Sequence, residues 1–198
     1  MKDKSLKKPF NTRRLVLLAI LTALVVILQL LGAFIRFGPF SISLVLMPIA
    51  VGAALLGIYA GGWLGLVFGF VVLMTGDAAV FLAINPFGTV FVVLVKGLLA
   101  GLAAGTVYKL LHKKSKTIAA ITAAAICPIV NTGIFIIGSY VFFLQTITEW
   151  GVAAGAVSAT AFIFLTLVGV NFLIEIGINL VLSPTIIRLI QIGERKEA

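Results

Sequence analysis

The chain has 198 residues, of which 62% are hydrophobic and only 11% are charged. A soluble domain carries roughly 25% charged residues, so this composition excludes a fold that water surrounds on all sides and indicates a membrane protein. The net charge of +9 could suggest nucleic-acid binding. The basic residues sit at the ends of apolar runs, however, and this placement is typical of membrane topology.

Apolar runs in the first half of the chain predict three helices. The first spans about residues 13–34, and it is too long and lacks the small-residue cleavage site of a signal peptide. The second is expected over about residues 42–58 with Pro48 inside it, which neighbouring helices can accommodate in a membrane bundle. The third is expected over about residues 63–75, after a tight turn at Gly61 and Gly62.

The second half of the chain predicts three longer apolar segments. Two helices are expected over about residues 88–111 and 117–144, followed by a polar loop over residues 145–151. The last apolar region, about residues 159–190, exceeds the length of a perpendicular crossing and must tilt or break. Pro184 is the predicted break, because proline disfavours helix at the residue before it.

Charge placement predicts six crossings with both termini in the cytoplasm. Thirteen of the 15 basic residues then lie on the inner side. They are Lys2, Lys4, Lys7, Lys8, Arg13, Arg14, Lys109, Lys113, Lys114, Lys116, Arg188, Arg195 and Lys196. The expected fold is an all-α, multi-pass plasma-membrane protein with one domain: a basic tail over residues 1–12, a six-helix bundle over 13–190 and a second tail over 191–198.

Glycines recur at every fourth position in two segments, at residues 57, 61, 65 and 69 and at residues 97, 101 and 105. Small residues at this spacing form a flat ridge on a helix, so two backbones can approach closely. The pattern predicts tight helix packing and by itself indicates no function.

Catalytic and metal-binding motifs are missing from the sequence. It contains no GxxxxGK[ST], no GxGxxG after a strand and no GxSxG, and its one cysteine and one histidine, Cys127 and His112, are too few for a zinc site. We therefore expect no enzyme activity, no metal, no cofactor and no nucleotide motor within this chain.

Two charges are expected at membrane depth, where each is costly unless paired or hydrated. Lys96 lies inside the predicted fourth helix, and Glu175 lies in the last one, on a stripe with Asn171 and Asn179 at spacings of four. Three interpretations remain open: a structural Lys96–Glu175 ion pair, a Lys96 contact to a substrate carboxylate, or a proton shuttle at Glu175. Glu175 and Asn171 are also candidate substrate-binding residues.

Other polar residues are candidate ligand contacts. Asn131 follows Pro128, and its amide suits either a polar ligand or a hydrogen bond between helices. Arg36 lies in the first outer loop, and Asp77 and Asn85 lie in the connection before the fourth helix. Phenylalanines inside the helices are interpreted as core and are not nominated.

Several motifs together resemble the substrate-binding S-components of energy-coupling-factor (ECF) vitamin transporters. The first helix contains the AxxxA pair Ala19 and Ala23, and the segment from Ile42-Ser-Leu-Val-Leu-Met-Pro48 to Gly57-Ile-Tyr-Ala-Gly-Gly62 is similar to the second helix of that family and its glycine-rich entry to the third. Asn85-Pro-Phe-Gly88 before a helix rich in glycine and alanine is also similar. The resemblance covers nearly the whole chain.

The resemblance implies a subunit that captures a vitamin or precursor at the outer face. It also implies a partner coupling module, made of one transmembrane subunit and two ATPase subunits, onto which Ala19 and Ala23 dock the chain. From the residues alone, this pair serves internal packing equally well. The mixture of lysine, arginine and asparagine, with few aromatic residues at the mouth, favours pantothenate, with riboflavin and cobalamin behind it.

The main alternative is an autonomous, ion-coupled secondary transporter of a small solute. Such carriers usually show internal repeats and broken helices, and no convincing repeat relates the two halves of this chain. A membrane enzyme is disfavoured, because the sequence offers no convergent set of catalytic residues. A structural or assembly factor is favoured only if no ligand binds.

Overall fold

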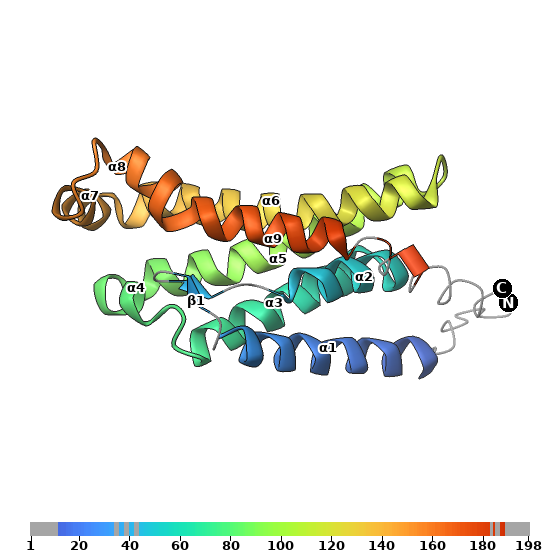
Figure 1. Ribbon diagram of the computed structural model, residues 1–198. Helices are drawn as coiled ribbons and strands as arrows, with labels where there is room; N and C mark the ends of the chain where they lie inside the picture. Colours follow the sequence, from blue (N-terminus) through green and yellow to red (C-terminus); the bar gives the residue numbers. More distant parts are fainter. Residues whose placement is uncertain are drawn as a thin grey trace, which may run out of the picture.

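A computed structural model describes residues 12–33, 36–37, 40–41, 44–182, 184 and 187–188 of the chain. Long helices run roughly side by side and form an elongated bundle (Figure 1). In chain order the elements are α1 Thr12–Gly32, β1 Arg36–Phe37, β2 Phe40–Ser41, α2 Leu46–Leu56, α3 Ile58–Met74, α4 Ala79–Ile84, α5 Pro86–Leu111, α6 Lys116–Phe142, α7 Leu144–Ala153, α8 Ala159–Ala161, the π-helix η1 Phe162–Gly169 and α9 Val170–Val181. β1 and β2 form a small antiparallel pair.

Several of the described helices have the length and surface of membrane-spanning segments. Four are long and apolar enough to cross a bilayer: α1, α5, α6 and the continuous segment Ala159–Val181, while α2 and α3 are apolar but shorter. Large apolar side chains face outward on most of these helices, including Ile20, Phe70, Phe91, Ile137 and Leu165. Such a surface suits lipid and not water. The all-helical membrane class is confirmed, and six crossings with both termini inside stay a prediction.

The junction of the second and third helices differs from the prediction. α2 begins at Leu46, so Pro48 falls in its first turn, where a missing backbone N–H costs nothing. The chain breaks at Gly57, whose φ of 100° is accessible to glycine, and α3 starts directly at Ile58. The predicted turn at Gly61 and Gly62 is wrong, because both lie inside α3.

The predicted polar loop over residues 145–151 is also wrong, because α7 occupies it. Phe143, Ile147 and Gly151 recur at every fourth position, and all three are buried. This apolar stripe packs against other buried residues of the chain, so α7 is a short amphipathic helix. The polar residues between them obscured the pattern in the sequence.

The last apolar region forms a continuous helical segment that ends at Val181, before Pro184, as the proline predicts. A π-helical stretch, η1, lies within it and was not predicted. Its wider turns bring the Phe164 carbonyl against Gly169, where a Cβ would collide with it. Ser183 lies outside the described residues.

The glycine ridges pack two helices together, as the spacing predicts. α3 and α5 make the most extensive helix contact, and Gly61 and Gly65 lie against the carbonyls of Gly101 and Gly97. A Cβ on Gly65 would collide with backbone and not with a movable side chain. Close backbone contact therefore fixes α3, and with it Phe68, relative to α5.

Gly65→Ala should destabilise the protein, because the added methyl group meets the Gly97 carbonyl and the helices must separate. Such overpacking costs about 1–3 kcal/mol. Thermal unfolding of the detergent-purified protein measures the effect. Gly133→Ala on α6 is the matched control, since a Cβ there meets nothing within 4 Å. An equal loss of stability in the two variants would contradict the assigned α3–α5 packing.

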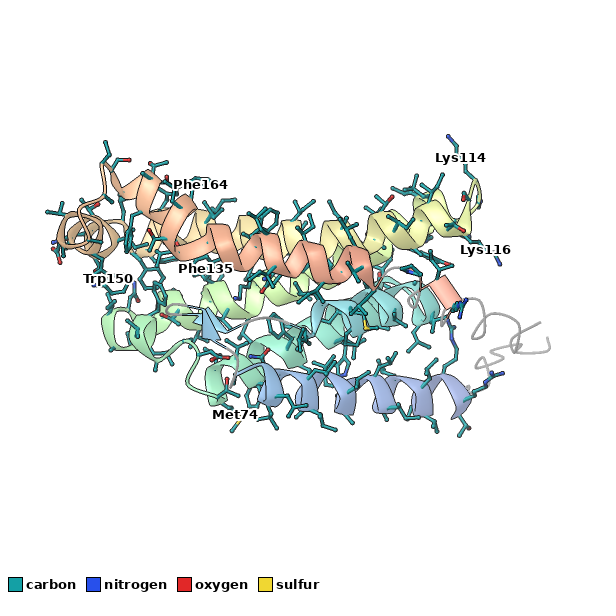
Figure 2. The ribbon with its side chains drawn as sticks, viewed as in Figure 1. Met74, Lys114, Lys116, Phe135, Trp150 and Phe164 are labelled. Carbon is teal, nitrogen blue, oxygen red and sulfur yellow. The ribbon has the colours of Figure 1, made fainter. Side chains whose placement is uncertain are left out.

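The two ends of the bundle differ in character. The start of α1, the end of α5 and the start of α6 gather at one end, whereas α4 and α7 lie at the other (Figure 1). Lys114 and Lys116 mark the first end and Trp150 marks the second (Figure 2). The basic residues at the helix starts and ends thus collect at the end away from α4 and α7.

Candidate functional site

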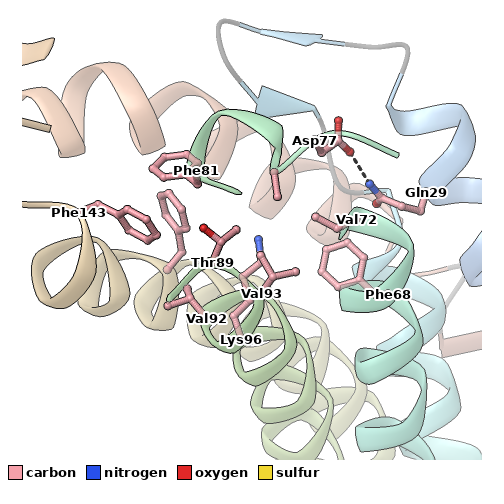
Figure 3. A pocket seen from close by; sticks show the side chains of 12 residues that line it. Gln29, Phe68, Val72, Asp77, Phe81, Thr89, Val92, Val93, Lys96 and Phe143 are labelled. Atoms are coloured by element: carbon pink, nitrogen blue, oxygen red, sulfur yellow. Dashed lines mark hydrogen bonds between the residues drawn. The ribbon is translucent and has the colours of Figure 1, made fainter. Parts of the chain in front are cut away.

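A cavity of about 60 Å³ lies at the end of the bundle that carries α4. Five helices and two connections contribute to its walls, and Figure 3 shows their side chains converging from several directions. The lining residues are Gln29, Phe68, Val72, Asp77, Ala78, Phe81, Thr89, Val92, Val93, Lys96, Phe135 and Phe143. The set is mostly apolar with a few polar groups, as is typical of small-molecule sites.

Lys96 is the cation of the cavity. Its side chain extends from α5 toward the open space, between Phe68 and the other walls (Figure 3). The Nζ atom lies 5.8 Å from the ring centroid of Phe68 and 5.6 Å from that of Phe135. Both distances fall in the range of cation–π attraction, so two aromatic faces from α3 and α6 hold the ammonium in place.

A cluster of aromatic rings closes the side of the cavity near α4. Phe81 packs edge-on against Phe135, Phe143 and Trp150, with ring centroids 5.8, 5.0 and 5.8 Å apart. Offset and edge-on ring pairs of this kind add to the stability gained by burial alone. The cluster therefore ties α4, α6 and α7 together over the Lys96 ammonium.

Polar groups from two other elements complete the wall. Gln29, buried on α1, donates from Nε2 to Asp77 Oδ2 over 2.8 Å (Figure 3). Thr75 Oγ1 donates to the same oxygen over 3.2 Å. The buried Thr89 hydroxyl donates to the Asn85 carbonyl over 2.8 Å, and its oxygen can still accept a hydrogen bond. The Gln29–Asp77 bond fastens the α3–α4 connection to α1.

A second group of polar side chains lies inside the bundle, on α9 and α6. Glu175 and Asn179 are buried on α9, and Glu175 interacts electrostatically with Lys96, as does Asp77. Asn179 Nδ2 donates to the Glu175 carbonyl over 2.8 Å. Within the described ranges, the buried side-chain oxygens of Asn131 and Asn179 accept no hydrogen bond.

A family model for the substrate-specific component of ECF transporters matches residues 13–187. The chain belongs to this family. The match covers nearly all of the helical bundle, so the resemblance inferred from the motifs is confirmed. No curated protein matches the chain significantly.

The cavity of this ECF substrate-specific component contains some, but not all, of the residues nominated from sequence. Lys96 lines it, and Glu175 lies near enough to interact with Lys96. Asn85 caps the start of α5, where its Oδ1 accepts from the Gly88 N–H over 2.9 Å. Asn131 is buried on α6 but does not line the cavity. A direct ligand contact for these residues stays a prediction.

Two nominated side chains lie outside the described residues: those of Arg36, whose backbone lies in β1, and Asn171, whose backbone lies in α9. The docking pair is described. Ala19 and Ala23 are both exposed on α1, so neither is buried against the described part of the chain, and their docking role stays a prediction. Among the described residues, no group of three His, Cys, Asp or Glu side chains gathers as a metal site.

Sequence reasoning missed several residues of the cavity. Gln29 could have been found, because it is an isolated amide in the apolar run of α1, and polar side chains at membrane depth mark function by default. The four phenylalanines at positions 68, 81, 135 and 143 gave no such signal, because an aromatic residue in an apolar helix is usually core. Four aromatic rings therefore line the cavity, whereas the substrate prediction considered only the few aromatic residues at its mouth.

Proposed function

We propose that this ECF substrate-specific component captures a small, carboxylate-bearing vitamin or precursor in the Lys96 cavity. The observation that carries the proposal is a lysine ammonium held between two aromatic rings inside a mostly apolar cavity. A fixed cation in a low-dielectric site attracts an anion far more strongly than it would in water.

The lining set supports a ligand with two distinct parts. Its carboxylate would meet the Lys96 ammonium, and the Thr89 hydroxyl could accept a further hydrogen bond. Phe68, Phe81 and the neighbouring aromatic residues would contact its apolar part. Pantothenate, which combines a carboxylate with a dimethyl-substituted carbon, stays the first candidate, ahead of riboflavin and cobalamin.

The size of the cavity supports the same order of candidates. Its volume of about 60 Å³ is well below the roughly 300–1,000 Å³ of typical small-molecule pockets. Binding would therefore require the aromatic cluster around Phe81 to shift outward, and the smallest candidate demands the smallest shift. Riboflavin and cobalamin are both larger than pantothenate.

The second part of the proposal concerns energy. The chain carries no ATP-binding motif, so we propose that a coupling module with two ATPase subunits drives uptake across the plasma membrane. The module would dock on the lipid-exposed face of α1 at Ala19 and Ala23, where two small side chains one turn apart leave a shallow notch. The aromatic-capped end of the bundle would face outward.

Native mass spectrometry of the detergent-purified protein tests the proposed substrate. We expect a bound species at one equivalent, with the mass of pantothenate, that is displaced by excess isotope-labelled pantothenate. A retained mass of a different acid would correct the substrate but keep the carboxylate class. A bound species without an anionic group would overturn the assignment of Lys96.

A transport assay separates the proposal from its main alternative. Vesicles that contain this chain together with the coupling module should accumulate the ligand only when ATP is present on the module side. Accumulation by the purified chain alone, driven by a proton or sodium gradient, would establish an autonomous carrier instead and would contradict the proposed partner.

A further inference from the structure

One wall of the Lys96 cavity is formed by a buried amide side chain. Gln29 lies on α1, is only 1% exposed and lines the cavity. Figure 3 shows it on one side of the Lys96 ammonium, with Phe81 and Phe143 on the other. A ligand carboxylate at Lys96 would thus share the cavity with a second polar side chain.

The hydrogen bond to Asp77 determines how the Gln29 amide is oriented. Its Nε2 atom donates to Asp77 Oδ2 over 2.8 Å. An ionised carboxylate only accepts hydrogen bonds, so the NH₂ end of the amide must be the end that meets Asp77. Rotating the amide by half a turn would place two acceptor oxygens against each other. Asp77 therefore holds Gln29 Oε1 in a position where it can only accept from another group.

That oxygen has no donor in the described part of the chain. Gln29 Oε1 is buried and accepts no hydrogen bond from the described residues. The buried side-chain oxygens of Asn131, Ser139 and Asn179 share this property, but none of these residues lines the Lys96 cavity. A buried acceptor without a donor is costly, so proteins normally satisfy it. Of the four groups, Gln29 is the one that a ligand in this cavity could satisfy.

The cation and the aromatic rings of the cavity suit two classes of acid. Lys96 would attract the carboxylate of a plain fatty acid as well as that of a more polar molecule, and the rings would contact the rest of either. The Thr89 hydroxyl already donates to the Asn85 carbonyl, so either class leaves it satisfied. An alkyl chain would leave Gln29 Oε1 desolvated and unpaired, whereas an N–H or O–H group would donate to it.

We propose that Gln29 Oε1 accepts a hydrogen bond from the ligand and so selects carboxylic acids that also carry an N–H or O–H donor. This inference rests on the proposed function, because it requires a ligand whose carboxylate lies at Lys96. Asp77 is the positioning residue, since it holds the amide in its accepting orientation. Pantothenate meets the requirement with an amide N–H and two hydroxyls, whereas octanoate, a plain alkyl acid, does not.

Titration calorimetry of the full, detergent-purified chain tests the inference with pantothenate and three analogues that each lack one donor. An ester replaces the amide in one analogue, and a hydrogen atom replaces one hydroxyl in each of the others. At least one analogue should bind the unchanged protein about tenfold more weakly than pantothenate does. Gln29→Met should weaken pantothenate by about the same factor, yet it should bind that analogue at least as tightly as the unchanged protein does.

Gln145→Met is the matched control for this substitution. Gln145 is exposed on α7, and its amide also donates to a carboxylate, that of Glu149, over 3.4 Å. The control should bind pantothenate as the unchanged protein does. If Gln29→Met fails to fold, Gln29→Asn keeps an amide but draws it back by one methylene. It should weaken pantothenate by about threefold without weakening the same analogue.

The inference and the proposed function fail in different ways. Unchanged pantothenate affinity in Gln29→Met would overturn the inference alone. An equal loss for pantothenate and all three analogues would also overturn it, because Gln29 would then act only by fastening Asp77. Octanoate binding to the unchanged protein as tightly as pantothenate would keep the carboxylate class but remove the proposed selectivity. Binding of neither acid would contradict the proposed function, and the inference with it.

Discussion

Replacing Lys96 with methionine should weaken ligand binding by about 30-fold or more, which corresponds to about 2 kcal/mol. Methionine keeps the length of the side chain and its contact with Phe68 and Phe135, but it removes the ammonium. A ligand carboxylate would then be desolvated in a mostly apolar cavity without a cation to offset the loss. Titration calorimetry with pantothenate, or with the acid that mass spectrometry identifies, measures the change.

Lys113→Met is the control for this experiment, since it makes the same chemical change at an exposed loop position. It should bind the ligand as the unchanged protein does. If Lys96→Met kept full affinity, Lys96 would serve structure, as partner of Glu175. In that case Glu175→Gln alone should lower thermal stability, and combining it with Lys96→Met should restore it, because no buried charge is then left without a partner.

The helices could be predicted from the sequence wherever one signal dominated. Long apolar runs located α1, α5 and α6 to within about two residues, because a membrane-spanning helix must satisfy every backbone group internally. The prediction was wrong where two signals competed. Gly57 and the Gly61–Gly62 pair both suggest a turn, and only packing against α5 shows that the pair belongs inside α3.

The candidate site was predictable only in its charged part. Lys96 could be recognised from the sequence because a charged residue in an apolar helix is costly at membrane depth and therefore marks a candidate site. The convergence of Gln29, Asp77 and Thr89 depends on how α1, the α3–α4 connection and α5 meet in space. That arrangement is set by contacts between helices distant in sequence, such as the Gln29–Asp77 hydrogen bond, so no local pattern reveals it.

Replacing both Ala19 and Ala23 with tryptophan should reduce ATP-driven uptake by at least about 100-fold while ligand binding to the isolated protein stays intact. Both side chains point away from the bundle, so two indole rings would project into the surface proposed for the coupling module. Helices that associate through small residues depend on close approach of their backbones, which these rings prevent. The Lys96 cavity has no lining residue at either position.

Ile20→Trp with Leu24→Trp is the matched control, because these exposed residues lie one turn apart at nearly the same depth but on another part of the α1 surface. At 3.6 residues per turn, they are rotated by roughly 100° from their alanine neighbours. The control should retain uptake and should purify with the module, whereas the alanine variant should do neither. Loss of ligand binding in the alanine variant would indicate a damaged fold, and full uptake would place docking on a different surface. A selective loss of uptake would assign this strip of α1 to the partner, because lipid tolerates a tryptophan that a packed helix interface does not.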